Sequence, residues 1–154
     1  ASKMGVSILN VHALGGKEMM LAAKEGIDKS NNDPYLIAVT LLTSMDSNTL
    51  KGIGFTSSIN DQILNLAKSA NQANLDGIVC SAKDISNIKN ILPKKFLYVT
   101  PGIRLSDNSN DDQKRITTPS EAIKMGSNII VIGRSITEAK FPEKILNQII
   151  DEIT

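Results

Sequence analysis

Short apolar runs alternate with amphipathic stretches along the whole chain. Five runs rich in β-branched residues are typical of strands that are buried on both faces of a sheet. They cover residues 7–13, 35–42, 77–81, 96–100 and 129–132. Apolar residues at helical spacing follow each run, so the pattern predicts the order βαβαβαβαβα. Such alternation requires a parallel sheet with right-handed crossovers and covering helices.

Capping signals mark where several of these helices begin. Three hydroxyl residues each stand three positions ahead of a carboxylate, which is the pattern of a helix N-terminus: Ser58 with Asp61, Ser81 with Asp84, and Thr118 with Glu121. Pro119 suits the first turn of the last helix, and Gly126 is placed to end it. Four methionines fit into the apolar stripes as core filling: Met19, Met20, Met45 and Met125.

Two α/β architectures fit this order, an open doubly wound sheet and a closed barrel. The dinucleotide-binding version of the open sheet carries G-x-G-x-x-G after its first strand. Here the first strand is followed only by Gly15-Gly16 and then Lys17. The sequence therefore disfavours a dinucleotide site.

Composition limits the partners. The 154 residues, 41% hydrophobic, suffice for a single domain over residues 1–154. Seventeen Lys and Arg against sixteen Asp and Glu give a net charge of +1, which predicts neither a nucleic-acid nor an anionic-membrane partner. Cys80 is the only cysteine, which excludes an internal disulfide and favours a reducing cytoplasm. No apolar run reaches the roughly 20 residues of a membrane span, and residues 1–5 lack a leader pattern.

The ends of the last two strands carry the clearest candidate chemistry. Residues 96–100 lead to Gly102 and Arg104, and residues 129–132 lead to Gly133 and Arg134. A glycine lets backbone amides approach a phosphate, and a guanidinium can donate two parallel hydrogen bonds to it. Ligands of parallel α/β folds bind at this end of the strands. The alternative is that both glycines only make turns and both arginines are solvated.

Other polar residues near strand ends allow two interpretations each. His12, the only histidine, is a candidate acid or base, although a hydrogen bond within the core is favoured. Cys80 is expected to be a small buried hydrophobe. Thr43 and Ser44 could contact a ligand or cap a short helix. The polar stretch at residues 105–114 is expected to be either disordered or a lid.

Five strand-end motifs in order resemble those of bacterial orotidine 5'-phosphate decarboxylase. They are Asn10-Val11-His12-Ala13-x-Gly15-Gly16, Val39-Thr40-x-Leu42-Thr43-Ser44-Met45, Gly77-x-Val79-Cys80-Ser81-Ala82, Val99-Thr100-Pro101-Gly102-Ile103-Arg104 and Val131-Ile132-Gly133-Arg134, with Asp112-Gln113-x-Arg115 in the polar stretch. The resemblance implies the (β/α)8 TIM-barrel fold, with this chain covering about the last five βα units. It also implies a homodimer that converts orotidine 5'-monophosphate into uridine 5'-monophosphate and CO2 in pyrimidine biosynthesis, with no cofactor and no metal.

The resemblance also implies roles for five residues. Arg104 and Arg134 would bind the substrate phosphate, with the Gly133 amide beside them. Gln113 would belong to a lid over the phosphate and the pyrimidine. Thr43 would lie at the base end of the pocket.

The family's catalytic motif is missing from this sequence. In the family, a lysine and aspartates in a D-x-K-x-x-D strand end carry the chemistry, and no strand end here has that pattern. The nearest string, Asp112-x-Lys114-x-x-Thr117, lies in the polar stretch and lacks the second aspartate. Loss of CO2 leaves a carbanion that needs an ammonium as proton donor. We therefore assign no catalytic residue, and expect the chain to grip the substrate without the first three strands.

Two alternatives remain at this point. One is another phosphate-binding barrel enzyme, such as a sugar-phosphate synthase or decarboxylase. The other is a non-catalytic half-barrel that binds phosphate weakly or self-associates through exposed sheet edges.

Overall fold

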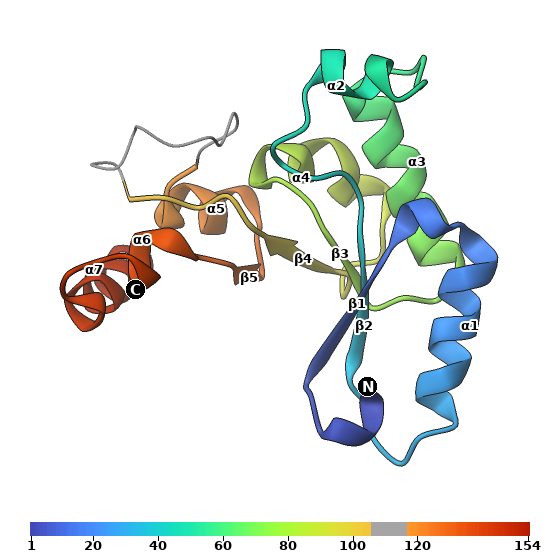
Figure 1. Ribbon diagram of the computed structural model, residues 1–154, viewed down its shortest axis with the longest axis horizontal. Coiled ribbons are helices and arrows are strands. Elements are labelled where there is room, and N and C mark those ends of the chain that lie inside the picture. Colours follow the sequence, from blue (N-terminus) through green and yellow to red (C-terminus); the bar gives the residue numbers. More distant parts are fainter. Residues whose placement is uncertain (106–116) are drawn as a thin grey trace.

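The structure, a computed structural model, describes residues 1–105 and 117–154. Five parallel strands form one sheet in the order β1-β2-β3-β4-β5 (Figure 1). They are β1 (Ile8–His12), β2 (Tyr35–Val39), β3 (Gly77–Val79), β4 (Leu97–Thr100) and β5 (Ile129–Ile130). The five predicted strands are confirmed, although each is shorter than its apolar run.

Helices connect the strands as the periodicity predicts. The α-helices are α1 (Lys17–Asp28), α2 (Ser47–Gly52), α3 (Ile59–Gln72), α4 (Ala82–Ile88), α5 (Pro119–Met125), α6 (Arg134–Thr137) and α7 (Pro142–Ile153). Short 3-10 turns are η1 (Ser2–Met4), η2 (Ala13–Gly15) and η3 (Lys89–Ile91).

The predicted caps start three of these helices. The Thr118 hydroxyl accepts from the Glu121 amide, and the Glu121 carboxylate accepts from the Thr118 amide at 2.9 Å. The Ser81 amide likewise donates to the Asp84 carboxylate at 3.1 Å. Ser58 accepts from the Asp61 amide, but its hydroxyl rather than its backbone amide meets the Asp61 carboxylate. Local sequence therefore sets where α3, α4 and α5 begin.

The strand order decides between the two predicted architectures. Each strand lies beside the next one in the chain, and the order never reverses. A doubly wound sheet reverses its order at a switch point, whereas a barrel does not. The doubly wound alternative is therefore wrong, and the sheet is wound in the single sense of a barrel.

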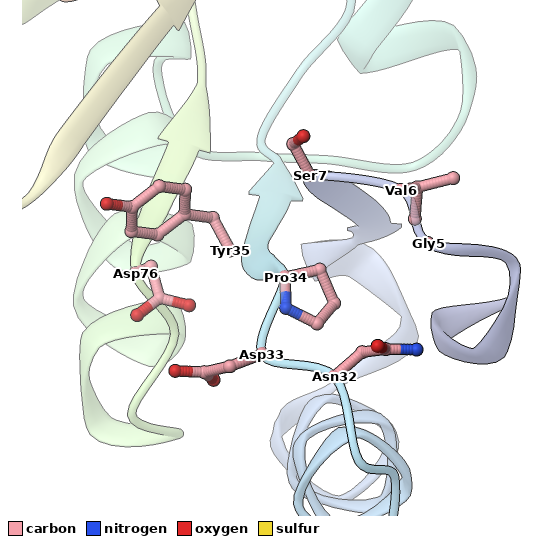
Figure 2. A pocket seen from close by; sticks show the side chains of 8 residues that line it. All are labelled: Gly5, Val6, Ser7, Asn32, Asp33, Pro34, Tyr35 and Asp76. Carbon is pink, nitrogen blue, oxygen red and sulfur yellow. The ribbon is translucent and has the colours of Figure 1, made fainter.

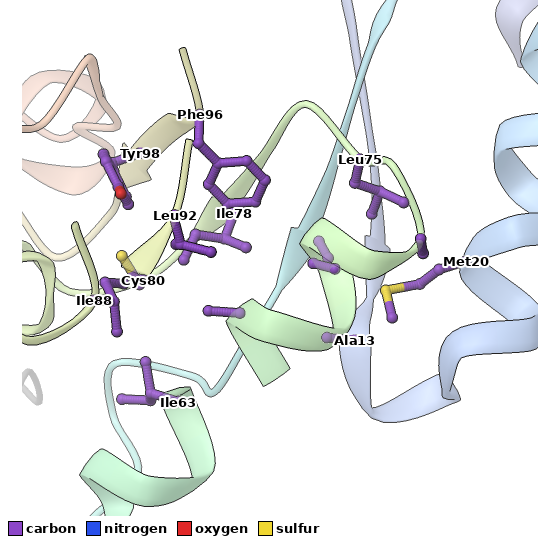
Figure 3. Close-up of a cluster of buried hydrophobic side chains, with 14 of the residues drawn as sticks. Ala13, Met20, Ile63, Leu75, Ile78, Cys80, Ile88, Leu92, Phe96 and Tyr98 are labelled. Carbon is purple, nitrogen blue, oxygen red and sulfur yellow. The ribbon is translucent and has the colours of Figure 1, made fainter. Parts of the chain in front are cut away.

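The main core lies between the sheet and α1, α3 and α4 (Figure 3). Strand residues of one face contribute to it, with helix residues against them: Leu36, Ala38, Ile78, Cys80 and Tyr98 from strands or strand ends, and Met20, Ile63, Ala67, Ile85 and Ile88 from helices. A smaller cluster joins Ala82, Ile103 and Ala122 under α5. The predicted core roles of Cys80 and of the four methionines are confirmed, because each is buried or packs against one of these clusters.

The other face of the sheet is covered unevenly. Ile37 and Val99, on inner strands, are buried there. On β1, by contrast, Asn10 and His12 are exposed. The prediction that every strand is buried on both faces is wrong for β1, because this strand has a neighbour on one side only. The prediction of a core hydrogen bond for His12 is wrong for the same reason.

Gly77 is needed for the close approach of β3 and β4. A Cβ at this position would lie 2.4 Å from the Leu97 carbonyl oxygen and 2.7 Å from the Leu97 Cβ. Both distances are far below van der Waals contact, so a side chain here would force the two strands apart. The central strand pair is packed backbone against backbone at this point.

Across residues 1–105 and 117–154, no helix is both long and apolar enough to cross a membrane.

Candidate functional site

The two predicted arginines follow adjacent strands at one end of the sheet. Thr100 of β4 pairs with Ile130 of β5, and the strands run in the same direction. Arg104 and Arg134 each follow their paired residue by four positions. The sheet therefore brings both arginines to the carboxyl edge, where ligands of parallel α/β folds bind.

Arg104 is held tightly beside the end of β4. Its side chain is buried, with 5% exposed. Its backbone amide donates to the Thr117 carbonyl at 3.1 Å, and its Nη1 donates to the Ile103 carbonyl at 3.0 Å. An isolated parallel bridge also joins Ile103 to Thr117. A guanidinium carries its charge at any physiological pH, so these contacts fix a permanent cation near the edge of the sheet.

Gly133 and Arg134 form a more open part of the same edge. Arg134 is exposed and begins the short helix α6. The Gly133 carbonyl accepts from the amides of Ile136 and Thr137 at 2.8 and 3.1 Å. A Cβ built on Gly133 would meet no heavy atom within 4 Å beyond its chain neighbours. The backbone at Gly133 therefore leaves space for a ligand, and Arg134 is the next residue along the chain.

Thr43 lies on the same edge but on a different strand connection. It is buried, with 7% exposed, in the turn between β2 and α2, and β3 separates β2 from β4. The α2 cap is Asp46, whose Oδ1 accepts from the Thr49 amide at 2.8 Å. The interpretation of Thr43 and Ser44 as the helix cap is therefore wrong, and the ligand role of Thr43 stays a prediction.

Two further candidate residues, Gln113 and His12, remain to be placed. Gln113 falls within residues 106–116, which are outside the described part of the chain. His12 ends β1 and so shares the carboxyl edge, exposed to solvent. Its interpretation as an acid or base stays a prediction.

Two buried hydroxyls beside the arginines were missed by the sequence predictions. Within the described residues, Thr117 Oγ1 and Ser135 Oγ are the buried side-chain oxygens with no hydrogen-bond partner. Thr117 is the residue whose carbonyl accepts from the Arg104 amide, and Ser135 directly follows Arg134. A buried hydroxyl without a partner costs about 1–3 kcal/mol. Their burial arises from tertiary packing, and no local sequence signal announces it.

Cys80, directly after β3, and Tyr98 of β4 lie on the helix-facing side of the sheet, within the main core. Burial raises the pKa of the Tyr98 phenol above its usual range, and the neighbouring Cys80 adds to the rise. Tyr98 therefore stays protonated at any physiological pH. Both groups belong to the core rather than to the candidate site.

A cavity of about 410 Å3 opens at the opposite end of the sheet (Figure 2). It lies at the amino ends of β1, β2 and β3, and Asp33 and Asp76 line it together with Tyr35. The Asp76 carboxylate accepts from the Leu36 amide at 2.7 Å, so it joins β2 to the approach of β3. Two carboxylates disfavour a phosphate, and the amino-terminal end of such a sheet serves stability.

Metal-binding chemistry has no cluster to support it in the described part of the chain. No group of three or more His, Cys, Asp or Glu side chains there could hold an ion. The candidate site is therefore defined by arginines, a glycine and hydroxyls, a set suited to an anion.

Comparison with known proteins gives a consistent family. The profile described as "Orotidine 5'-phosphate decarboxylase / HUMPS family" matches residues 1–149. A curated orotidine 5'-phosphate decarboxylase from Saccharophagus degradans is 47% identical over 153 residues, which are 99% of this chain and 64% of that protein. The protein of the same name from Buchnera aphidicola is 48% identical, over 99% of this chain and 65% of its own length.

Solved structures agree. Orotidine 5'-phosphate decarboxylase from Lactobacillus acidophilus superposes with a TM-score of 0.83 at 35% identity, covering 99% of this chain and 66% of its own. The protein of the same name from Pyrococcus horikoshii gives a TM-score of 0.70 at 22% identity, which supports the fold alone. These neighbours are TIM barrels, and the chain spans about two thirds of their length. The chain belongs to the orotidine 5'-phosphate decarboxylase / HUMPS family.

Proposed function

We propose that this chain is the substrate-gripping part of an orotidine 5'-phosphate decarboxylase. The whole enzyme would convert orotidine 5'-monophosphate into uridine 5'-monophosphate and CO2 in pyrimidine biosynthesis, without cofactor or metal. The main observation that supports this proposal is that Arg104 and the Gly133–Arg134 pair follow adjacent, paired strands of the family's fold.

The 5'-phosphate is proposed to lie between the two arginines. The open space beside Gly133 admits a phosphate oxygen, and the exposed Arg134 can turn its planar guanidinium toward it. Arg104 donates hydrogen bonds to the carbonyls of Ile103 and Thr117, and these contacts preorganise its cation. The buried hydroxyl of Ser135 can donate a further hydrogen bond to the same anion.

Two more residues complete the proposed pocket. Thr43 would contact the pyrimidine end, from its buried place after β2. Gln113 would contact the phosphate, following the resemblance alone. Binding energy collected at the phosphate can be used to hold the distant reacting carbon in place.

The proton donor is proposed to come from outside this chain. The D-x-K-x-x-D motif is missing from the sequence, and arginine is too weak an acid to protonate the carbanion at C6. We therefore expect the chain alone to bind nucleotide without decarboxylating it, which is also what the non-catalytic half-barrel hypothesis requires. The whole enzyme is proposed to be a cytoplasmic homodimer.

Calorimetric titration of the chain with uridine 5'-monophosphate tests the proposed phosphate-binding site. We expect Arg134→Ala to weaken binding by about 10-fold or more, because a hydrogen bond to a charged group contributes about 1.5–3 kcal/mol. Lys89→Ala is the matched control, because Lys89 is an exposed cation in η3, before β4 and so at the opposite end of the sheet. Equal affinities for both variants would refute the site.

Substrate class needs a second titration. Ribose 5-phosphate offers the same phosphate without the base, so a nucleotide-specific pocket should bind it much more weakly than uridine 5'-monophosphate. Equal or tighter binding of the pentose phosphate would favour another phosphate-binding barrel enzyme instead.

A further inference from the structure

The two halves of the proposed phosphate site follow β4 and β5, and these strands share the shortest ladder in the described part of the sheet. Five residues of β1 pair with β2, and three residues pair in each of the next two ladders. Between β4 and β5 the pairs are Val99 with Ile129 and Thr100 with Ile130. The separation of the two halves of the site therefore depends on two backbone pairs and on whatever side chains support them.

Three side chains support this short ladder. The hydroxyl oxygens of Thr100 and Ser127 lie 2.5 Å apart, and both residues are buried. The Asn128 Oδ1 accepts from the Tyr98 amide at 2.9 Å. Thr100 and Tyr98 belong to β4, whereas Ser127 and Asn128 lie between α5 and β5. Side-chain hydrogen bonds therefore join β4 to the approach of β5.

We propose that the Thr100–Ser127 hydroxyl pair positions the phosphate-binding edge, because it fixes where the Gly133–Arg134 pair lies relative to Arg104. The inference rests on the proposed phosphate site and deepens it. Thr100 and Ser127 are positioning residues, since their buried hydroxyls bond to each other and to backbone carbonyls rather than to a ligand.

Thr100 is connected closely to both halves of the site. It stands four residues before Arg104, and its carbonyl accepts from the Val131 amide at 2.9 Å, three residues before Arg134. A change in the hydrogen bonding of Thr100 would therefore shift one arginine relative to the other. A misplacement of about 1 Å can cost an enzyme on the order of 100-fold, so a small shift is enough to weaken binding.

The two hydroxyls are expected to act as a unit. Each hydroxyl has one proton to donate. One proton lies between the two oxygens, and the other can reach the Ile129 carbonyl, which is 3.1 Å from Ser127 Oγ and 3.4 Å from Thr100 Oγ1. Removal of either hydroxyl would leave its buried partner with fewer hydrogen bonds, which is costly.

Calorimetric titration with uridine 5'-monophosphate tests the pair with substitutions that preserve the shape of the strand. Thr100→Val replaces the hydroxyl by a methyl group and should weaken binding by about 5-fold or more. Thr100→Ser retains the hydroxyl and should bind within about 2-fold of the unsubstituted chain. An unchanged affinity in Thr100→Val, or a failure of Thr100→Ser to retain affinity, would overturn the proposal.

Thr40→Val is the matched control for loss of a buried hydroxyl. The Thr40 hydroxyl donates to the Val79 carbonyl at 2.8 Å, so it joins β2 to β3 and not β4 to β5. Both valine variants should lower the melting temperature, but only Thr100→Val should weaken binding. Titration with ribose 5-phosphate, which has no base to contact Thr43, repeats the comparison for the phosphate end. Equal losses of affinity would mean a general loosening of the sheet and would overturn the proposal.

A double variant tests whether the two hydroxyls act together. Thr100→Val with Ser127→Ala should bind no more weakly than the weaker single variant, because either substitution already breaks the pair. Losses that multiply would overturn the pair as the positioning unit. Arg134→Ala separates this result from the phosphate site. A loss of affinity in Arg134→Ala without one in Thr100→Val overturns the positioning role alone, whereas no loss in Arg134→Ala overturns the site and the inference together.

Discussion

The middle and the flanks of this sheet differ in what holds them. Ile78 of β3 is fully buried, and Ile37 and Val99 are buried on the other face of their strands. On β1 the corresponding face exposes Asn10 and His12, and beyond β5 Val131 is 47% exposed. The strands in the middle have a neighbour on each side, whereas the outer two have one.

This difference shows that an apolar run predicts a strand but does not predict that both faces of the strand are buried. Strand-forming apolar runs occur equally in the middle and at the flanks, so the chain adopts strands throughout. Burial of their second face depends on a neighbouring strand, which the flanks lack. The residues of the candidate site follow this gradient, because Arg104 beyond β4 is buried and Arg134 beyond β5 is exposed.

The strongest test of the contrast removes the same side chain from both regions. Ile78→Ala should lower the free energy of unfolding by about 4 kcal/mol, because it empties a fully buried site. Ile8→Ala, in half-buried β1, should cost only about 1 kcal/mol, because solvent and neighbours can fill the space. Urea unfolding of both variants measures this, and similar losses would contradict a weakly packed flank.

Gly77 tests how tightly the middle strands are joined. Gly77→Ala should cost about 3 kcal/mol, since its Cβ would meet the Leu97 backbone. Gly26→Ala is the control, because a Cβ on this α1 residue meets no heavy atom within 4 Å. The control should stabilise the chain by roughly 0.5–1 kcal/mol. Glycine-to-alanine substitution would then lower the free energy of unfolding at position 77 and raise it at position 26. Thermal unfolding of the two variants measures this difference.

The strands and most helix starts were predictable because their causes are local. An apolar run and a capping pair such as Thr118 and Glu121 act within a few residues, so sequence alone reports them. Asp46, three positions before Thr49 and directly before α2, is a cap signal of the same kind, whereas Thr43 and Ser44 lie closer to the end of β2 and do not cap the helix. The positions of these elements therefore depend little on the rest of the fold.

Burial at the flanks was not predictable, because its cause is distant. Nothing in the β1 sequence tells whether a strand lies on its other side, so His12 was expected in the core and is exposed. The unpartnered hydroxyls of Thr117 and Ser135 also depend on tertiary packing. The arginine pair was predictable because strand ends and chain order together fix which edge each residue reaches.

The two arginines should respond differently to removal, which sharpens the contrast at the site. Arg134→Ala and Arg104→Ala should each weaken uridine 5'-monophosphate binding by about 2 kcal/mol. Only Arg104→Ala should also lower the melting temperature, because Arg104 is buried and its Nη1 donates to Ile103. Calorimetric titration and thermal unfolding separate the two effects. Equal melting temperatures for the two variants would count against Arg104 as a structural part of the edge.

The smallest expected effect concerns pH and the middle of the sheet. Burial raises the pKa of Tyr98, so the folded chain keeps this proton after the unfolded chain has lost it. The unfolded chain then binds fewer protons above pH of about 10, and stability falls as pH rises further. Tyr98→Phe removes the titrating group and should make that fall shallower. Urea unfolding of both proteins between about pH 8 and 11 measures the slopes. Parallel curves would mean that the phenol reaches solvent, and that the central core is looser than its packing against Phe96 and Cys80 indicates.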